Sequence, residues 1–302
     1  MRFELTAEQR DFRDSLESLL AAADTVKVGR AWAAGDHEPG LALWRRLADL
    51  GVNTLLVPED DGGLGATPVE LCVAFEALGR HAVPGPWVES VAFLQLADGS
   101  LGTVAAPPHT PYALDADVAE HVFVAGPDGL QTGTVGESVA SVDPSRHLFH
   151  VSPGGRVRDL PDHAFDLAAL ATAAELLGAG ERVLADSVIY VKQRKQFGRE
   201  IGSYQAIKHQ LANVRIALDF ARPLVFGAAV DPTPRSVSAA KIQSAAAADL
   251  AARVGLQVHG AIGYTDEYDL SRWLLRIRAL QTAWGTPAFH RERLLADLLD
   301  AR

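Results

Sequence analysis

Two short segments of this chain combine residue types that can bind a phosphate-bearing ligand. An arginine guanidinium is planar and can contact phosphate in a bidentate manner, and each charge-assisted hydrogen bond contributes roughly 1.5–3 kcal/mol. Glycine lets a ligand approach the backbone closely, and a glutamine amide can both donate and accept hydrogen bonds. The two segments, with one glutamine between them, contain Arg194, Gln196, Phe197, Gly198, Gln205, Gln257, Gly260 and Gly263.

Each of these residues also has an ordinary structural explanation. Arg194 could cap a helix C-terminus, Gly260 could end a helix, and Gln205 could be a helix-surface residue. Thr286, a further hydrogen-bonding candidate near the C-terminus, is open to the same two interpretations. The residue types alone therefore do not decide between a ligand site and a set of helix ends.

Long helices must position these residues. Apolar residues recur with a helical period before Arg194, and a helix of that length spans about 45 Å and presents the arginine at its end. The predicted helices of this region include those at about 165–195, 241–258, 270–277 and 288–299. Long helices joined by short breaks indicate a helical bundle.

The N-terminal part of the chain has the same helical character, and a short middle part does not. Thr6 and Gln9 predict a capping box at the first helix. In the middle part, β-like runs alternate with Gly-Pro-Asp-Gly and Asp-Pro-Ser turns. The expected fold is mainly α with a small β domain: an N-terminal helical domain at 1–95, a reduced middle β domain at 96–160, and a C-terminal helical bundle at 161–302.

Composition limits the classes of partner. The chain has 302 residues, of which 48% are apolar and 22% charged, with a formal net charge of −10 and mixed signs along the chain. Nucleic acid and anionic membranes are therefore not expected partners, and any anionic ligand needs a local basic patch. The single cysteine, Cys72, allows no internal disulfide and is expected to be buried; no apolar run reaches the ~20 residues of a membrane span. With no signal-peptide core at the N-terminus, a cytoplasmic location is expected.

Several common catalytic motifs are absent from the sequence. It contains no P-loop, no His-Glu-x-x-His, no Gly-x-Ser-x-Gly elbow, and no Gly-x-Gly-x-x-Gly after a strand. Gly178 and Gly180 fall inside a helical pattern and are interpreted as packing residues. The ten histidines are scattered along the sequence, so no metal site is predicted.

The ordered set of motifs resembles the acyl-CoA dehydrogenase family over both helical domains. The N-terminal residues that carry the resemblance include Leu5, Thr6, Gln9, Arg10, Trp44, Arg45, Val57, Pro58, Glu59, Gly62, Gly63, Gly65, Glu76, Gly79 and Arg80. Those in the C-terminal bundle include Arg194, Gln196, Phe197, Gly198, Tyr204, Gln205, Gln257, Gly260, Gly263, Tyr264, Glu267, Arg272, Arg278, Gly285 and Thr286.

The resemblance implies a fold, a cofactor and a reaction. It implies a C-terminal four-helix bundle, FAD as the cofactor, α,β-dehydrogenation of an acyl-CoA, and an electron-transfer flavoprotein as the electron acceptor. The residues that it assigns to FAD binding are Arg194, Gln196, Phe197, Gln205, Gln257, Gly260 and Thr286.

The chain departs from the family at the catalytic base. The family's glutamate, which precedes Gly-Thr, corresponds to Trp284 here, and the position used by a subset of the family on the long helix corresponds to Ala168. Neither residue accepts a proton, and loss of a positioned base typically costs 10²–10⁴, by order of magnitude, in rate. No catalytic residue is therefore predicted. Substitution by another carboxylate stays open, with Asp266 and Glu267 the nearest in sequence, although Glu267 matches a position that the family tends to share for structure.

The middle domain departs as well. The family's Thr-Glu-Pro-x-x-Gly-Ser-Asp flavin segment has no counterpart, and residues 102–108 stand where it should begin. In this family the flavin lies at a subunit interface, and the chain keeps mainly the contacts that a neighbouring subunit makes. This pattern resembles the short, non-catalytic subunit of heteromeric acyl-CoA dehydrogenases from actinobacterial steroid catabolism.

The expected role is that of a subunit in a flavin-dependent acyl-CoA dehydrogenase. Its partner would be a longer homologue, and its substrate a bulky, steroid-derived acyl-CoA. Two alternatives remain. The chain could be a self-sufficient flavoenzyme with an unrecognised base, or a non-enzymatic scaffold that binds acyl-CoA.

Overall fold

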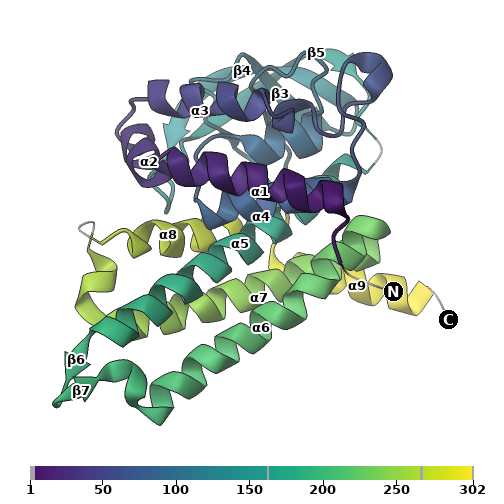
Figure 1. The fold of residues 1–302 in the computed structure, drawn as a ribbon. Coiled ribbons are helices and arrows are strands. Elements are labelled where there is room, and N and C mark those ends of the chain that lie inside the picture. Colours follow the sequence, from purple (N-terminus) through teal and green to yellow (C-terminus); the bar gives the residue numbers. More distant parts are fainter. Residues whose placement is uncertain (1–3, 162, 266–267, 301–302) are drawn as a thin grey trace.

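The chain forms two helical parts and a small sheet, as Figure 1 shows for the computed structural model. The structure describes residues 4–161, 163–265 and 268–300. The fold class is mainly α with a small β domain, as predicted. Among the described helices, none is both long and apolar enough to cross a membrane.

Local capping signals begin the N-terminal helices. Thr6 and Gln9 form the predicted capping box, in which Thr6 Oγ1 accepts from the Gln9 N–H at 3.2 Å and Gln9 Oε1 accepts from the Thr6 N–H at 3.0 Å. Cys72 is buried, as expected. The N-terminal elements are α1 (Ala7–Ala22), α2 (Thr25–Ala33), α3 (Glu38–Ala48), η1 (Val52–Thr54), η2 (Glu59–Asp61), α4 (Pro68–Arg80) and the π-helical η3 (Val88–Leu94).

The middle part is a five-stranded sheet with the strand order β1-β3-β4-β5-β2. Its strands are β1 (Gly102–Ala105), β2 (Ala113–Leu114), β3 (His121–Gly126), β4 (Gly129–Val139) and β5 (Leu148–Arg158). β1 runs parallel to β3, and the other neighbouring strands are antiparallel. The three longest strands were predicted, whereas β1 was missed because its four residues are all buried and show no polar–apolar alternation.

The C-terminal part contains long helices that lie side by side in Figure 1. Its elements are α5 (Ala164–Gln193), β6 (Lys195–Gln196), β7 (Arg199–Glu200), η4 (Ile201–Ser203), α6 (Gln205–Val230), α7 (Pro234–His259), η5 (Gly260–Tyr264), α8 (Leu270–Leu280) and α9 (Pro287–Asp300). The predicted helices are present, although α7 begins at Pro234 and not near residue 241, and the β6–β7 hairpin was not predicted.

Glycines allow α4 and α5 to touch. A Cβ atom on Gly178 would lie 1.9 Å from the carbonyl oxygen of Glu76. A Cβ atom on Gly79 would lie 2.0 Å from the carbonyl oxygen of Glu175. Because neither helix has room for a methyl group at this crossing, the packing role predicted for Gly178 is confirmed.

A buried arginine joins the three parts of the molecule. The Arg276 guanidinium on α8 donates to Asp143 Oδ2 at 2.6 Å and to Ser145 Oγ at 3.1 Å, both in the connection between β4 and β5. It also donates to Glu175 Oε1 on α5 at 3.1 Å and to the Val83 carbonyl at 3.0 Å. Breaking a buried ion pair typically costs about 3–5 kcal/mol, so Arg276 holds the sheet against both helical parts.

Candidate functional site

The first candidate segment forms a hairpin at the end of α5. Strands β6 and β7 are antiparallel, and the turn between them has φ values of 52° at Phe197 and 80° at Gly198. Gly198 suits this left-handed conformation because it has no Cβ. Phe197 is 92% exposed at the tip of the turn. Burial of a Phe side chain stabilises a structure by roughly 1.5–3 kcal/mol. Because the Phe197 ring is not buried within this chain, it would gain this stabilisation through contact with a second molecule.

Arg194 occupies the junction of α5 and the hairpin. Its N–H donates to the Tyr190 carbonyl at 2.9 Å, and its carbonyl accepts from the Ile201 N–H at 2.8 Å, so both backbone groups are used. Within the described residues, its exposed side chain makes no hydrogen bond or ion pair. The nearby Arg199 differs, because its guanidinium lies 3.9 Å from the ring centre of Tyr204. Arg194 therefore presents an unengaged cation from a fixed backbone.

The second candidate segment lies at the same end of the bundle. The His259 ring at the end of α7 stacks on the Tyr190 ring of α5, with the ring centres 4.2 Å apart, and His259 Nδ1 donates to the Gly255 carbonyl at 2.7 Å. Burial lowers the pKa of His259, which favours this neutral tautomer. Gly260 follows with a φ of 66°, and nothing lies within 4 Å of the position that its Cβ would take. The chain therefore leaves open space beside the Gly260 backbone.

Six of the seven predicted FAD-binding residues thus belong to one end of the bundle. Gln205 is exposed as the first residue of α6, and Gln257 is exposed in the last turn of α7. Thr286 lies apart from them. It directly precedes α9, which Figure 1 shows on the opposite side of the molecule from β6 and β7, and its Oγ1 accepts from the Phe289 N–H at 3.2 Å. The hydroxyl of Thr286 therefore caps a helix.

A second region surrounds Trp284, the residue that the sequence resemblance aligned with the family's catalytic base. Trp284 is 1% exposed, and its ring centre lies 4.8 Å from Phe93 of η3 and 6.1 Å from Phe165 of α5. Its φ is 54°, a left-handed conformation that is rare for a bulky residue and persists only where surrounding contacts impose it. At this position an aromatic ring packs against two other elements, η3 and α5.

Two buried side chains hold the backbone around Trp284. Lys241 Nζ donates to the carbonyls of Leu280 at 3.1 Å, Gln281 at 3.4 Å and Gly285 at 3.3 Å. Burial lowers the pKa of Lys241 to about 7, and the three acceptors oppose this shift because an ammonium group has three donors. The Lys241 side chain therefore holds the backbone from Leu280, at the end of α8, to Gly285.

His290 provides the other support. Its Nε2 lies 3.0 Å from the Trp284 carbonyl, which can only accept, so Nε2 is the donor. Burial lowers the pKa of His290 to about 4, which leaves Nδ1 free to accept from Ser238 Oγ at 3.1 Å. Gly285 has a φ of 99°, and a Cβ there would lie 2.6 Å from His290 Nε2. Glycine is therefore required at this position.

A carboxyl group that the sequence did not reveal lies against Trp284. Glu89 on η3 is 1% exposed, and burial raises its pKa, while the charge of Arg146 and the Trp284 indole N–H oppose the rise. The interaction is poorly directed, because neither Glu89 Oε2 nor Trp284 Nε1 has a hydrogen-bond partner that meets ordinary geometry among the described residues. No local motif could have identified Glu89, since only the packing of η3 on the 280–286 loop brings the two residues together.

Of the other positions that the sequence offered for a base, the structure describes only Ala168. Ala168 is 0% exposed inside α5, where its carbonyl accepts from Thr172 Oγ1 at 2.8 Å. Asp266 and Glu267 lie outside the described residues.

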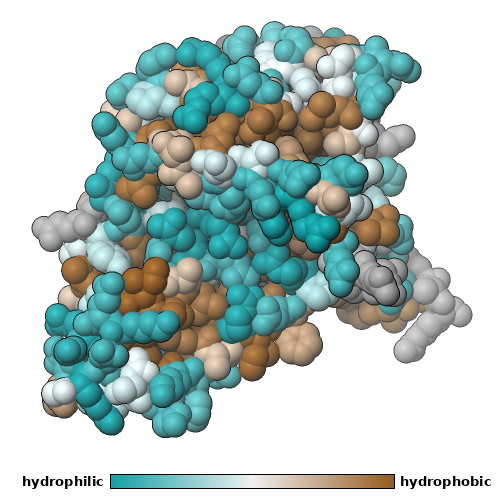
Figure 2. Space-filling model, in the orientation of Figure 1, coloured by the Kyte–Doolittle hydropathy of each residue, from teal (hydrophilic) through white to brown (hydrophobic). Residues whose placement is uncertain are grey.

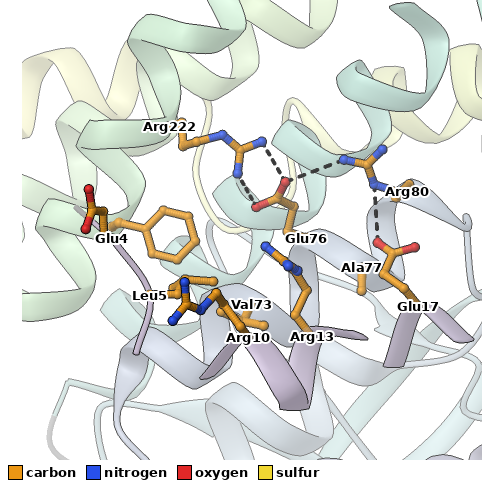
Figure 3. Close-up of a pocket in the computed structure, with 11 residues that line it drawn as sticks. Glu4, Leu5, Arg10, Arg13, Glu17, Val73, Glu76, Ala77, Arg80 and Arg222 are labelled. Atoms are coloured by element: carbon orange, nitrogen blue, oxygen red, sulfur yellow. Dashed lines mark hydrogen bonds and ion pairs between the residues drawn. The ribbon is translucent and has the colours of Figure 1, made fainter. Parts of the chain in front are cut away.

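Two cavities of the described structure are candidate ligand sites. One, of about 380 Å³, lies between the sheet and the loop before α9, and its lining includes Thr110, Arg146 and Thr286. The other, of about 560 Å³, is bordered by α1, α4 and α6 (Figure 3). Figure 3 shows Glu76 between Arg80 and Arg222, with the Arg222 contact at 2.7 Å and the Arg80 contact at 3.8 Å. Glu76 therefore offsets the charges of Arg80 and Arg222, whereas Arg10 also lines this cavity and makes no side-chain hydrogen bond or ion pair among the described residues.

Comparison with known proteins identifies the family. The model for the acyl-CoA dehydrogenase N-terminal domain matches residues 6–99, and the model for the C-terminal domain matches residues 159–299. Acyl-CoA dehydrogenase IpdE2 of Mycobacterium tuberculosis is 33% identical in an alignment that covers 97% of this chain and 98% of that protein. The chain belongs to the acyl-CoA dehydrogenase family.

Solved structures share the whole fold. A chain of the ChsE4-ChsE5 complex from Mycobacterium tuberculosis superposes with a TM-score of 0.84 and 23% identity, and the match covers 99% of each chain. A chain of the Tcur3481-Tcur3483 steroid ACAD variant gives a TM-score of 0.80 and 22% identity, and covers 97% of this chain and 98% of that one. At this level of identity the similarity establishes the fold.

Family membership supports FAD as the cofactor, as predicted. The bundle end fits the phosphate-bearing half of FAD, because it offers the unengaged Arg194 guanidinium and open space at Gly260. The region where the family's ring-binding segment should begin fits less well. Residues 102–105 form the buried strand β1, whose backbone pairs with β3.

Proposed function

We propose that this chain is one subunit of a hetero-oligomeric, FAD-dependent acyl-CoA dehydrogenase. It binds the phosphate side of a FAD whose ring rests on a longer homologous partner, and it is inactive alone. FAD supplies the hydride acceptor for α,β-dehydrogenation, and the partner supplies the base. The residues that we propose to contact the cofactor are Arg194, Gln196, Phe197, Gln205, Gln257, Gly260 and, in a separate part of the chain, Thr286.

The main support for this proposal is Trp284, the residue at the predicted base position. A carboxylate there would take the α-proton of the substrate, but Trp284 is buried on Phe93 and Phe165 and has no proton-accepting group. The family's cofactor-binding residues nevertheless remain exposed at the bundle end. A chain that keeps one half of a shared site needs a second chain for the other half.

Exposed apolar side chains support assembly with another chain. Ile216, Phe220 and Leu224 recur every four residues on α6 and are 52%, 70% and 41% exposed. They therefore share one helix face that the described fold leaves in water. Hydrophobic surface is also visible over the C-terminal bundle in Figure 2. The names of the ChsE4-ChsE5 complex and of the Tcur3481-Tcur3483 ACAD, each of which names two chains, support a partner that is itself a homologue.

The substrate that we infer is a bulky, steroid-derived acyl-CoA. One structural relative is named a steroid ACAD, and this likeness supports the substrate class. Electrons pass from the reduced cofactor to an electron-transfer flavoprotein. A cytoplasmic location fits the single buried cysteine, Cys72.

Purification of the chain alone, and together with a longer homologue encoded near it, tests the proposal. We expect no FAD and no dehydrogenase activity from the chain alone, and a stable yellow complex with fewer flavins than chains from the pair. Full FAD occupancy and activity in the chain alone would overturn the subunit model. Tight binding of a CoA ester without flavin in any complex would favour the non-enzymatic alternative.

One observation favours a self-sufficient enzyme as the second candidate. Glu89 is a carboxyl group beside Trp284, and displacement of the indole ring would expose it. If Glu89 is the base, activity of the chain alone falls about 10²–10⁴-fold in E89Q, whereas E137Q, which changes an exposed carboxylate on β4, keeps full activity. If the subunit model holds, the chain alone has no activity for either substitution to change.

A further inference from the structure

The fold brings together two histidines and an aspartate that are distant in sequence. His37 Nε2 lies 3.3 Å from His147 Nδ1 and 3.9 Å from Asp117 Oδ2. The three potential ligand atoms all lie within 4.8 Å of one another. None of these residues belongs to the bundle end or to the Trp284 region.

Each residue comes from a different connection. His37 is the N-cap of α3 and makes no capping hydrogen bond with its side chain. Asp117 follows β2, and His147 directly precedes β5. The cluster therefore spans the boundary between the N-terminal helices and the sheet. All three side chains keep some exposure to solvent, between 15% and 34%, so an ion could enter.

A fourth side chain, that of Asp115, bonds to the backbone of His147. Asp115 is fully buried, and its Oδ1 accepts from the Trp32 indole N–H at 3.2 Å and from the His147 N–H at 3.0 Å. The same oxygen lies 3.6 Å from His147 Nδ1. Asp115 Oδ2 is buried and has no hydrogen-bond partner among the described residues. A buried carboxylate with an unused oxygen, next to the His147 imidazole, is a feature that a nearby cation would satisfy.

We propose that His37, His147 and Asp117 bind a divalent transition metal of the zinc class, with water as a fourth ligand. Imidazole nitrogens bind Zn²⁺ at about 2.0–2.1 Å, so two ligand atoms of a tetrahedral site lie about 3.3 Å apart. The distance between His37 Nε2 and His147 Nδ1 has this value. The Asp117 oxygen is slightly farther away, on a partly exposed loop side chain that can rotate toward the ion.

The metal would cross-link two parts of the chain. It would tie the start of α3 to the sheet, next to Trp32, whose ring centre lies 4.6 Å from that of His37. A bound ion stabilises the folded state because the unfolded chain does not hold its ligands together. This role is independent of flavin binding and does not rest on the proposed function.

Metal titration of the full, chelator-treated chain tests the site. We expect about one equivalent of Zn²⁺ to bind and the melting temperature to rise by several degrees. H37N and H147Q should each weaken binding at least about tenfold. The matched control is H121N, because His121 Nε2 lies the same 3.9 Å from Asp98 Oδ2 but contacts no second imidazole within the part of the chain that the structure describes.

The alternative is a simple hydrogen bond between the two imidazoles. Zn²⁺ binding that is absent, or that H37N and H147Q leave unchanged, would overturn the proposal. Circular dichroism establishes whether each variant folds. If a variant fails to fold, Co²⁺ added to the unchanged chain decides the question: intense visible absorption of a tetrahedral site supports it, and the weak spectrum of hydrated Co²⁺ rejects it.

Discussion

The bundle end and the Trp284 region differ in how they use their side chains. At the bundle end, Arg194 makes no internal side-chain contact among the described residues, and Phe197 is 92% exposed. Around Trp284, the buried side chains of Lys241 on α7 and His290 on α9 are bonded to carbonyls of the loop. The side chains of the first region are available to another molecule, whereas those of the second region contact other residues of this chain. Substitutions should therefore affect binding in one region and folding in the other.

The Trp284 region should show the largest effect on stability. Replacement of Trp284 by alanine removes a ring packed on Phe93 and Phe165, and we expect a loss of about 3–5 kcal/mol in the free energy of unfolding. Urea denaturation measures this loss. The matched variant at the other region, Phe197→Ala, should change stability by no more than about 0.5 kcal/mol. A reversed order of the two variants would break the comparison.

Arg194 should show the opposite behaviour. Arg194→Met removes charge-assisted hydrogen bonds to a phosphate worth roughly 1.5–3 kcal/mol, so the complex with the partner should bind FAD about 10- to 100-fold more weakly. The melting temperature of the chain alone should stay unchanged. Lys192→Met, which removes an exposed cation two residues earlier in α5, is the control and should retain FAD. Equal retention of FAD by both variants would contradict the assignment.

Substitution of Thr286 tests whether this residue caps α9 or binds FAD. Its Oγ1 caps α9 through the Phe289 N–H, so Thr286→Ala should lower stability by about 1 kcal/mol. Thermal unfolding measures the change, with the exposed Thr282→Ala as the control. If Thr286→Ala loses as much FAD as Arg194→Met without a change in stability, Thr286 belongs with the bundle end.

The smallest effect concerns pH and Glu89. Burial raises the pKa of Glu89 above its ordinary value of 4.5, so the unfolded chain loses this proton at lower pH than the folded chain. Stability therefore falls as pH rises from about 4.5 through the folded pKa. Glu89→Gln removes this dependence, and its melting temperature relative to the unchanged chain should rise across that window. Glu137→Gln, at an exposed site on β4, should show a flat difference.

Much of the fold could be predicted because its signals are local. The helical period before Arg194, the Thr6–Gln9 capping box and the β runs of the three long strands each depend on neighbours within a few residues. The strand β1 and the β6–β7 hairpin were missed, since a short buried strand has no alternation and a two-residue strand has no pattern. The order of the motifs identified the family and its cofactor from the sequence.

The candidate site could be predicted only in part. The hydroxyl of Thr286 caps α9 on the opposite side of the molecule from the hairpin, and its role in FAD binding stays a prediction from the family motifs. The motifs gave no sign of Glu89. A motif records which residue types occur in order, and it does not record which side chains a folded interior brings into contact.

The sequence by itself predicted the helices, the replacement of a proton-accepting residue by Trp284, and the retention of an arginine, three glutamines and a glycine that suit a dinucleotide. Only the tertiary structure decided that the Trp284 ring lies buried on Phe93 and Phe165. It alone placed His37 beside His147, 110 positions away. The physical reason is that periodicity and capping act within a few residues of the chain, whereas burial and contacts between distant side chains depend on how all the elements pack.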